Sequence, residues 1–151
     1  MNTEKALNKI AGQCSKKEYC TKEVREKLSN WELDEEAINK IVTFLIHHKF
    51  VDDTRYARIY AEDKFRFNHW GKQKINMMLH QKGIASDTIS EALAVIDNDH
   101  YSNSCMEILQ QKLKNTTEPD PYKLRAKLTR FALSRGFDYD IINKCVEELL
   151  S

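Results

Sequence analysis

The residue types that most often do chemistry are present in this chain, but their spacing fits no catalytic or metal-binding pattern. The four cysteines are Cys14, Cys20, Cys105 and Cys145, and none of them forms a C-x-x-C pair. A structural zinc site usually needs two close pairs of ligands, so this spacing argues against one. The sequence also contains no P-loop, no G-x-S-x-G and no H-E-x-x-H motif. We therefore expect no enzyme activity, no metal site and no cofactor.

The best paired carboxylates are Asp52 and Asp53. Such a pair could bind Mg²⁺. A structural role is favoured, because the Asp53 carboxylate can cap a helix that begins at Thr54 by accepting its free backbone N–H groups. Cys145 falls at an apolar position and is expected in the core, as a reduced thiol.

Two stretches of the chain, 64–86 and 122–137, carry basic side chains and no acidic ones, although the formal net charge is only +1. They supply ten candidate binding residues. These are Lys64, Arg66, Lys72, Lys74, Lys82, Lys123, Arg125, Lys127, Arg130 and Arg135. Such cations can hold DNA through its phosphates, pair with an acidic protein groove, or simply form a solvated helix surface. The residues alone leave these three interpretations open.

Three aromatic residues, Phe65, Phe67 and Trp70, lie among the basic residues of the first stretch. Aromatic rings can stack on nucleic-acid bases. Packing of these rings against neighbouring helices is the favoured interpretation, because aromatic side chains tend to be buried.

The elements that must position these residues are predicted to be helices. Apolar residues recur at helical spacing in nine segments and alternate in none, which predicts an all-α fold. The segments are 6–11, 24–28, 38–45, 56–61, 75–79, 89–96, 106–113, 124–131 and 142–149. With only four glycines and two prolines, the 151-residue chain lacks the turn residues of an all-β protein.

The helices repeat three times along the chain. Gly83 and Gly136 each follow an apolar-periodic stretch, where a left-handed residue ends a helix, and Glu32 occupies the same register position. This register predicts three-helix repeats at 1–51, 52–99 and 100–151. Two further helix starts are predicted, with Asp87 and Asp120 as the capping residues.

No stretch approaches the length of about 20 apolar residues that a membrane helix requires. The first 12 residues lack the apolar region of a signal peptide. We therefore expect a cytoplasmic protein with no membrane partner, and we expect it to be a monomer.

Four blocks of the sequence carry distinctive motifs. In the centre, 50–57 reads F-V-D-D-T-R-Y-A and 71–84 begins G-K-Q-K-I. Toward the ends, 15–28 begins S-K-K-E and 135–137 reads R-G-F. Together these blocks resemble the RecX family of bacterial regulatory proteins, whose signature I-D-D-x-x-[FY]-A is followed by a G-K-x-x-I element. The chain departs from the family in having lysine at Lys72 and Lys74, where arginine is frequent, and Trp31-Glu32 where glycine is common.

The resemblance implies three tandem three-helix modules in an elongated, curved molecule. It also implies a non-enzymatic regulator that binds the helical groove of the RecA recombinase filament. Single- or double-stranded DNA is the second partner, either as part of that filament or bound weakly alone. The usual consequence is inhibition of strand exchange and of ATP hydrolysis by RecA, in the regulation of recombination, DNA repair and the SOS response.

The alternative is a direct DNA-binding protein of the helix-turn-helix type, in which the last helix of a three-helix unit reads the major groove. The predicted third helices are acidic or neutral, with Glu91 and Asp97 in the second repeat and Glu147 and Glu148 in the third. The basic residues lie on the second helices instead, which argues against base recognition.

Overall fold

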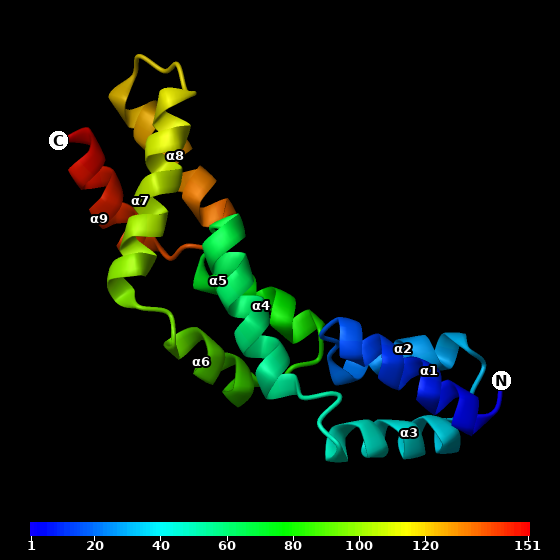
Figure 1. Cartoon of the computed structure of the whole chain (residues 1–151). Helices are drawn as coiled ribbons and strands as arrows, with labels where there is room; N and C mark the ends of the chain where they lie inside the picture. Colours follow the sequence, from blue (N-terminus) through cyan, green and yellow to red (C-terminus); the bar gives the residue numbers. More distant parts are fainter. The chain divides into compact units, whose positions relative to one another are not determined.

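The computed structural model describes residues 1–151 as nine α-helices with no β-strand (Figure 1). In chain order they are α1 Thr3–Lys16, α2 Thr21–Asn30, α3 Glu35–His47, α4 Asp53–Asn68, α5 Lys72–Gln81, α6 Ser86–Ala94, α7 Asn98–Lys114, α8 Pro121–Ser134 and α9 Tyr139–Leu150. Each predicted periodic segment falls on its own helix, although 89–96 runs two residues past the end of α6. The all-α prediction is confirmed.

The chain divides into two compact units. The first unit contains Met1–Ile59 and Leu79–Ile89, and the second contains Tyr60–Met78 and Ser90–Ser151. Helices α1 to α3 belong wholly to the first unit and α7 to α9 wholly to the second. The repeat boundaries after residues 51 and 99 stay a prediction.

In the first unit, the apolar faces of α1, α2 and α3 meet in one core. Ile10, Leu28 and Leu45 come from the three helices in turn, and all are fully buried. Apolar residues three or four positions apart lie on one face of a helix, which is why the sequence pattern marks these residues. Burial of each such side chain contributes about 1.5–3 kcal/mol.

In the second unit, α7, α8 and α9 pack pairwise around a second core. Leu109, Leu128 and Ile142 come from the three helices and are fully buried. Cys145 on α9 belongs to this core, as its apolar position predicts.

The helix starts follow the capping rules, with corrections. The carboxylate of Asp120 accepts the backbone N–H of Tyr122, and Pro121 is the first residue of α8, as predicted. The prediction for Asp87 is wrong. Because α6 begins one residue earlier, Asp87 lies inside its first turn, and its carboxylate accepts the N–H of Thr88.

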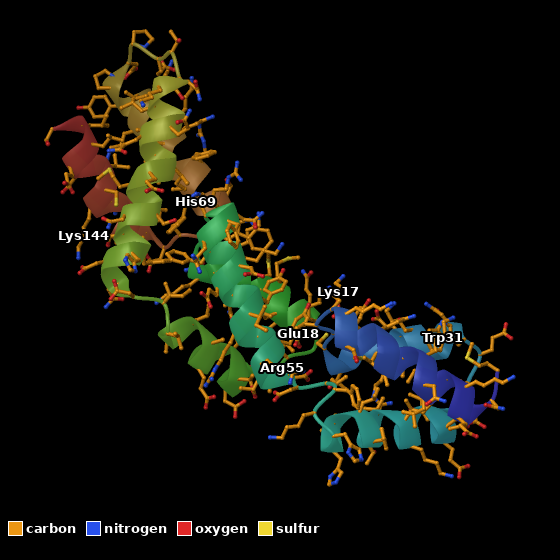
Figure 2. The ribbon with its side chains drawn as sticks, in the orientation of Figure 1. Lys17, Glu18, Trp31, Arg55, His69 and Lys144 are labelled. Carbon is orange, nitrogen blue, oxygen red and sulfur yellow. The ribbon has the colours of Figure 1, made fainter.

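The prediction for Asp53 is wrong by one residue. Helix α4 begins at Asp53 itself, and the carboxylate that accepts the N–H of Arg55, at 3.0 Å, belongs to Asp52. The Asp53 carboxylate instead accepts the N–H and the hydroxyl of Thr21 at the start of α2. The guanidinium of Arg55 donates to Glu18 at 2.9 Å, so this end of α4 is bonded to the residues before α2 (Figure 2).

The turn after the second helix of each repeat has the same backbone conformation. Gly83 has φ 76° and Gly136 has φ 96°, both in the left-handed region that glycine adopts without strain. Glu32 has φ 62° at the equivalent position of the first repeat. The predicted register of the three turns is confirmed.

In the first unit, the start of α2 is bonded to the turn that ends α5. The Sγ of Cys20 lies 3.5 Å from the carbonyl oxygen of Lys82, and the Nζ of Lys22 donates to the carbonyl of Gln81 at 2.8 Å. The ammonium of Lys82 donates to the carboxylate of Glu23 on α2 at 3.0 Å. We call this set of side-chain bonds the α2 contact.

In the second unit, the start of α5 is bonded to the turn that ends α8 through backbone atoms. The N–H of Gly71 donates to the carbonyl of Arg135 at 2.7 Å, and the N–H of Gln73 donates to that of Gly136 at 3.0 Å. The backbones are so close that a Cβ on Gly71 would lie 2.3 Å from the carbonyl carbon of Gly136. We call this the α5 contact.

Candidate functional site

Nine of the ten predicted basic residues belong to the second unit, and Lys82 belongs to the first. In the second unit they lie on the last part of α4, the first turn of α5, and α8 with the residue that ends it. These nine are Lys64, Arg66, Lys72, Lys74, Lys123, Arg125, Lys127, Arg130 and Arg135. The structure therefore gathers most of the predicted site into one compact unit.

Four of the ten basic side chains lie within 4.0 Å of a carboxylate oxygen. The pairs are Lys82–Glu23 at 3.0 Å, Lys127–Glu118 at 3.0 Å, Arg66–Glu62 at 3.1 Å and Arg125–Glu147 at 3.7 Å. Exposed ion pairs contribute little stability, so an external anion can compete for such a cation. Lys82 differs, because its ion pair is part of the α2 contact.

Six of the ten have no carboxylate oxygen within that distance, and all six lie in the second unit. They are Lys64, Lys72, Lys74, Lys123, Arg130 and Arg135. A cation without an internal partner keeps its full attraction for phosphate or carboxylate groups of a binding partner. These residues are the strongest electrostatic feature of the site.

Trp70 lies between two of these cations. The Nζ atoms of Lys64 and Lys74 are 5.0 Å and 4.5 Å from the centroid of its ring, and the ring of Tyr60 approaches it edge-on at 6.4 Å. Cations held over a ring are attracted by its negative face. The ring is half-buried, and both ammonium groups lie within about 5 Å of its centroid.

The other two aromatic residues of this stretch differ from each other. Phe65 packs against the core of the second unit, with its ring 6.0 Å from that of Tyr101, as predicted. The packing prediction is wrong for Phe67, whose side chain is 72% exposed beside the guanidinium of Arg66. Phe67 lies on the solvent side of α4, where no helix covers it.

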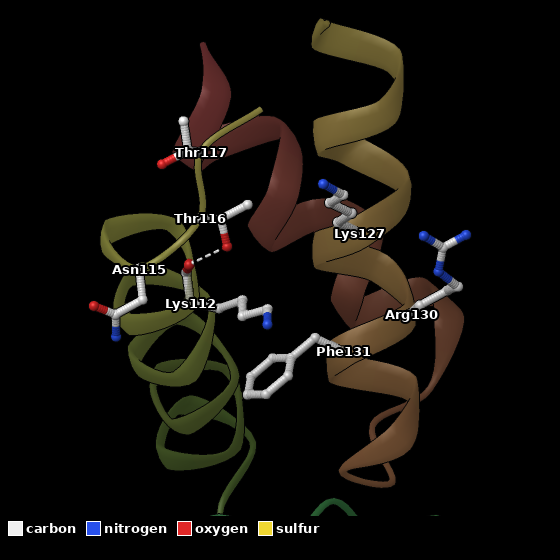
Figure 3. A pocket seen from close by; sticks show the side chains of 7 residues that line it. All are labelled: Lys112, Asn115, Thr116, Thr117, Lys127, Arg130 and Phe131. Atoms are coloured by element: carbon white, nitrogen blue, oxygen red, sulfur yellow. Dashed lines mark hydrogen bonds between the residues drawn. The ribbon is translucent and has the colours of Figure 1, made fainter. Parts of the chain in front are cut away.

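A cleft of about 560 Å³ opens between α7 and α8 (Figure 3). Lys127 and Phe131 extend into it from α8, and Lys112 extends into it from α7. Arg130 and the polar residues that follow α7 complete the lining. Lys112 was missed by the sequence analysis because it lies outside the acid-free stretches, and only the packing of α7 on α8 brings it to this site.

A second hollow of about 320 Å³ adjoins the cleft, and it shares Lys112, Asn115 and Phe131 with it. The surface that lines it is mainly apolar. Ile108 and Phe131 are its apolar residues, and the other lining residues, Asn68, His69, Gln111, Lys112, Asn115 and Arg135, have polar or charged side chains. The guanidinium of Arg135 lies 4.9 Å from the centroid of the Phe131 ring and lines this hollow.

The titratable groups support electrostatic binding rather than nucleophilic chemistry. Burial raises the pKa of Cys20 to about 11 and also raises that of Cys105, so both thiols stay protonated at neutral pH. Burial also raises the pKa of Tyr101 to about 12, and its oxygen accepts the N–H of Lys72.

No group of three or more His, Cys, Asp or Glu side chains is placed to hold a metal ion. None of the nine helices has both the length and the apolar character needed to cross a membrane.

The comparisons with known proteins agree with this architecture. Family models described as the first, second and third three-helix domains of RecX match residues 6–45, 52–93 and 100–146. The regulatory protein RecX of Clostridioides difficile is 31% identical over 147 residues, which cover 97% of this chain and 69% of that protein. The chain belongs to the RecX family. The resemblance seen in the sequence is confirmed, and three RecX three-helix domains account for the nine helices.

Other RecX proteins are also similar to this chain in sequence or in fold. The regulatory protein RecX of Clostridium botulinum is 41% identical over 132 residues, which cover 86% of this chain and 61% of that protein. The chain thus spans about three fifths of the length of several curated relatives it matches. The crystal structure of RecX from Lactobacillus salivarius has a TM-score of 0.89 at 24% identity and covers 97% of this chain and 96% of that one. That structure shows the same fold.

Proposed function

We propose that this chain is a regulator that binds the RecA–DNA filament and inhibits the strand exchange and ATP hydrolysis of RecA. Membership of a family whose relatives are named regulatory proteins supports a regulatory role. The partners are RecA and the DNA within its filament, and the chain acts as a cytoplasmic monomer without a cofactor or an enzymatic activity of its own.

The observation that carries this proposal is the set of six basic side chains in the second unit without a carboxylate partner. Lys72 and Lys74 on α5 and Lys123 on α8 are typical members. A filament groove offers both phosphates and protein carboxylates, and unpaired Lys and Arg side chains attract both. The ten predicted residues remain the proposed binding set, with Lys82 the least available because Glu23 holds it.

Direct sequence-specific DNA binding is the less favoured function. The third helix of the last repeat, α9, carries Glu147 and Glu148, and Glu147 pairs with Arg125 of α8. A helix with two exposed carboxylates at this end is repelled by the phosphates that border a major groove. A marked preference for one DNA sequence in a binding assay would revive this function.

Charge reversal on the two basic helices tests the proposal. One variant carries Lys72→Glu with Lys74→Glu, and another carries Lys123→Glu with Arg130→Glu. Each is titrated into RecA filaments on single-stranded DNA while ATP hydrolysis is followed. We expect about tenfold or greater loss of potency in each. Lys123 and Arg130 are exposed, so each of their substitutions should change stability by about 0.5 kcal/mol or less. Lys72 and Lys74 are half-buried beside the α5 contact, so the melting temperature of that variant is measured in parallel.

Two controls complete the experiment. Lys144→Glu changes an exposed lysine of α9 that belongs to no proposed site, and it should retain full potency. Reversal of Lys22 and Lys27 on the mixed helix α2 should also matter less, with melting temperature followed in parallel because Lys22 bonds to Gln81. Equal potency of all the variants would remove the basic helices from the mechanism, and no inhibition by the parent chain would refute the function.

A further inference from the structure

An oxyanion lies beside the cleft between α7 and α8, bonded to one of the side chains that line it. The carboxylate of Glu118, in the segment between the two helices, accepts from Lys127 at 3.0 Å through one oxygen and from the N–H of Asp120 at 3.3 Å through the other. The Glu118 side chain is 14% exposed, whereas Lys127 is 41% exposed. The Lys127 ammonium therefore binds an oxyanion while one side of it still faces the open cleft.

The cleft holds more positive than negative charge. Lys112 extends into it from α7 (Figure 3), has no carboxylate within 4.0 Å, and lies with its Nζ 5.1 Å from the centroid of the Phe131 ring. Lys112, Lys127 and Arg130 all line the cleft, and Glu118, which lies beside it, is the carboxylate that pairs with Lys127. An incoming anion of greater charge density than a carboxylate is favoured at such a site.

The neighbouring hollow gives the cleft a second, apolar part. The two share Lys112 and Phe131, so the cationic part and the apolar part meet along these side chains. The guanidinium of Arg135, 4.9 Å from the centroid of the Phe131 ring, lines the hollow but not the cleft. A nucleotide has this polarity, because a charged phosphate adjoins a sugar and a flat base. An acidic peptide supplies the charge but has no need of the apolar part.

We propose that the cleft between α7 and α8 binds one nucleotide of single-stranded nucleic acid, with its phosphate displacing the Glu118 carboxylate from Lys127 and its base entering the hollow beside Phe131. This inference rests on the proposed function in one respect. It takes the nucleic acid that enters the cleft to be the DNA of the RecA filament. In the free protein Glu118 occupies Lys127, so it weakens binding, and its removal strengthens binding.

The test uses the full chain and a fluorescein-labelled oligothymidylate of about 15 nucleotides, a length chosen to exceed a typical single-strand site. Anisotropy titrations compare the parent with Glu118→Gln, which keeps an oxygen to accept the N–H of Asp120, and with Lys112→Gln. Matched controls are Glu148→Gln and Lys144→Gln on α9, which change the net charge equally outside the cleft. Each variant is also assayed for inhibition of RecA.

We expect Glu118→Gln to bind the oligonucleotide about threefold to tenfold more tightly and Lys112→Gln to bind it about threefold to tenfold more weakly, while the controls change less than twofold. The salt dependence of binding should be about 0.7 less steep for Lys112→Gln, as for the loss of one phosphate contact on a single strand. A gain of binding in Glu118→Gln cannot come from unfolding.

Three results would overturn the inference. Equal changes in the α9 controls would show a non-specific charge effect, unchanged binding in Glu118→Gln would show that the carboxylate does not compete, and equal competition by polyglutamate would assign the cleft to an acidic protein. If any of these results occurs while the charge-reversal variants of α5 and α8 still fail to inhibit RecA, the proposed function stands and the cleft assignment fails. If the cleft variants behave as expected and RecA is not inhibited, the nucleotide site stands and the proposed function fails.

Discussion

The α2 contact and the α5 contact join equivalent parts of the repeat, but they are built from different atoms. In both, the start of a second helix meets the left-handed turn that ends the second helix of the next repeat. The α2 contact uses the side chains of Cys20, Lys22 and Glu23, whereas the α5 contact joins backbone to backbone at Gly71 and Gly136. Cys20 and Gly71 occupy the same position of the repeat, immediately before α2 and α5, and only Cys20 has a side chain there.

The difference shows what sets the distance between the two elements. In the α2 contact, the thiol of Cys20 lies between the backbone at the start of α2 and the carbonyl of Lys82. The long side chains of Lys22 and Lys82 make the other bonds across this wider separation. Without a side chain, the backbones approach until their own N–H and carbonyl groups bond directly. The α5 contact should therefore tolerate no added atom, while the α2 contact should adjust to several kinds of change.

The largest effect is expected for Gly71→Ala. The new methyl group would lie 2.3 Å from three backbone atoms of the turn at Gly136 and Phe137, so the two backbones must separate and lose their hydrogen bonds. We expect a loss of about 3 kcal/mol or more in the free energy of unfolding, measured by urea denaturation. A loss below about 1 kcal/mol would show that the backbone contact is not rigid.

A smaller effect is expected for Gly83→Val in the other turn. A Cβ at Gly83 would meet only the flexible Lys22 side chain, at 3.4 Å, so the main cost is the positive φ of 76°. We expect a loss of about 1–2 kcal/mol, again by urea denaturation. An unchanged midpoint would count against the left-handed turn, and a loss as great as that of Gly71→Ala would remove the contrast between the contacts.

Glu23→Gln should produce a smaller loss that depends on pH. Burial raises the pKa of Glu23, but the N–H of Cys20 and the ammonium of Lys82 outweigh this and leave that pKa below its ordinary value. The ionised carboxylate therefore stabilises the fold above its ordinary pKa, and this contribution is lost as the pH falls through the lowered pKa. We expect a loss of about 1 kcal/mol at neutral pH.

Comparing the parent with Glu23→Gln as the pH is lowered isolates the contribution of the Glu23 carboxylate. Between about pH 6 and pH 3, the parent should lose more melting temperature than Glu23→Gln, because only the parent has the carboxylate to protonate. Parallel curves for the two proteins would mean that the carboxylate contributes nothing to the α2 contact. Glu36→Gln, in an exposed ion pair with Lys40, is the matched control and should change little.

The smallest effect is expected for Cys20→Ser. The hydroxyl can replace the thiol as donor to the carbonyl of Lys82, and serine is a preferred residue at a helix start. We expect a change of about 0.5 kcal/mol or less by urea denaturation. A loss of about 2 kcal/mol or more would show that the volume of the sulfur is essential and that the α2 contact is as rigid as the α5 contact.

The sequence predicts the helices because their cause is local. Residues such as Ile10 and Leu28 mark buried faces through their spacing, and Gly83 and Gly136 mark turns through their backbone freedom. Helix starts are less certain from sequence, because Asp52 and Asp53 both have the right side chain, and the choice depends on whether Thr21, from another part of the chain, needs the second carboxylate.

The binding residues are harder to predict because pairing depends on distant chain segments. The acid-free stretches identify where basic residues are concentrated, but nothing near Lys82 or Lys127 in sequence shows that Glu23 or Glu118 reaches them. Lys112 joins the cleft only because α7 packs on α8. Gly71 gives no turn signal either, since its role is close approach rather than an unusual φ.

The recurrence of the contact also bears on how such a chain grows. The first two repeats each contain a second-helix start that docks onto the turn of the next repeat, and the last two each contain a turn that receives one. Equivalent positions lie about 51–53 residues apart. A tandem duplication of one repeat therefore copies both halves of the contact at once, and the new copy arrives with a complementary surface for its neighbour. After duplication, a single codon change at the position of Cys20 or Gly71 can make that new interface adjustable or rigid. The repeat thus contains both surfaces needed to join it to a neighbouring copy. Selection at the position of Cys20 and Gly71 can change how rigid that joint is.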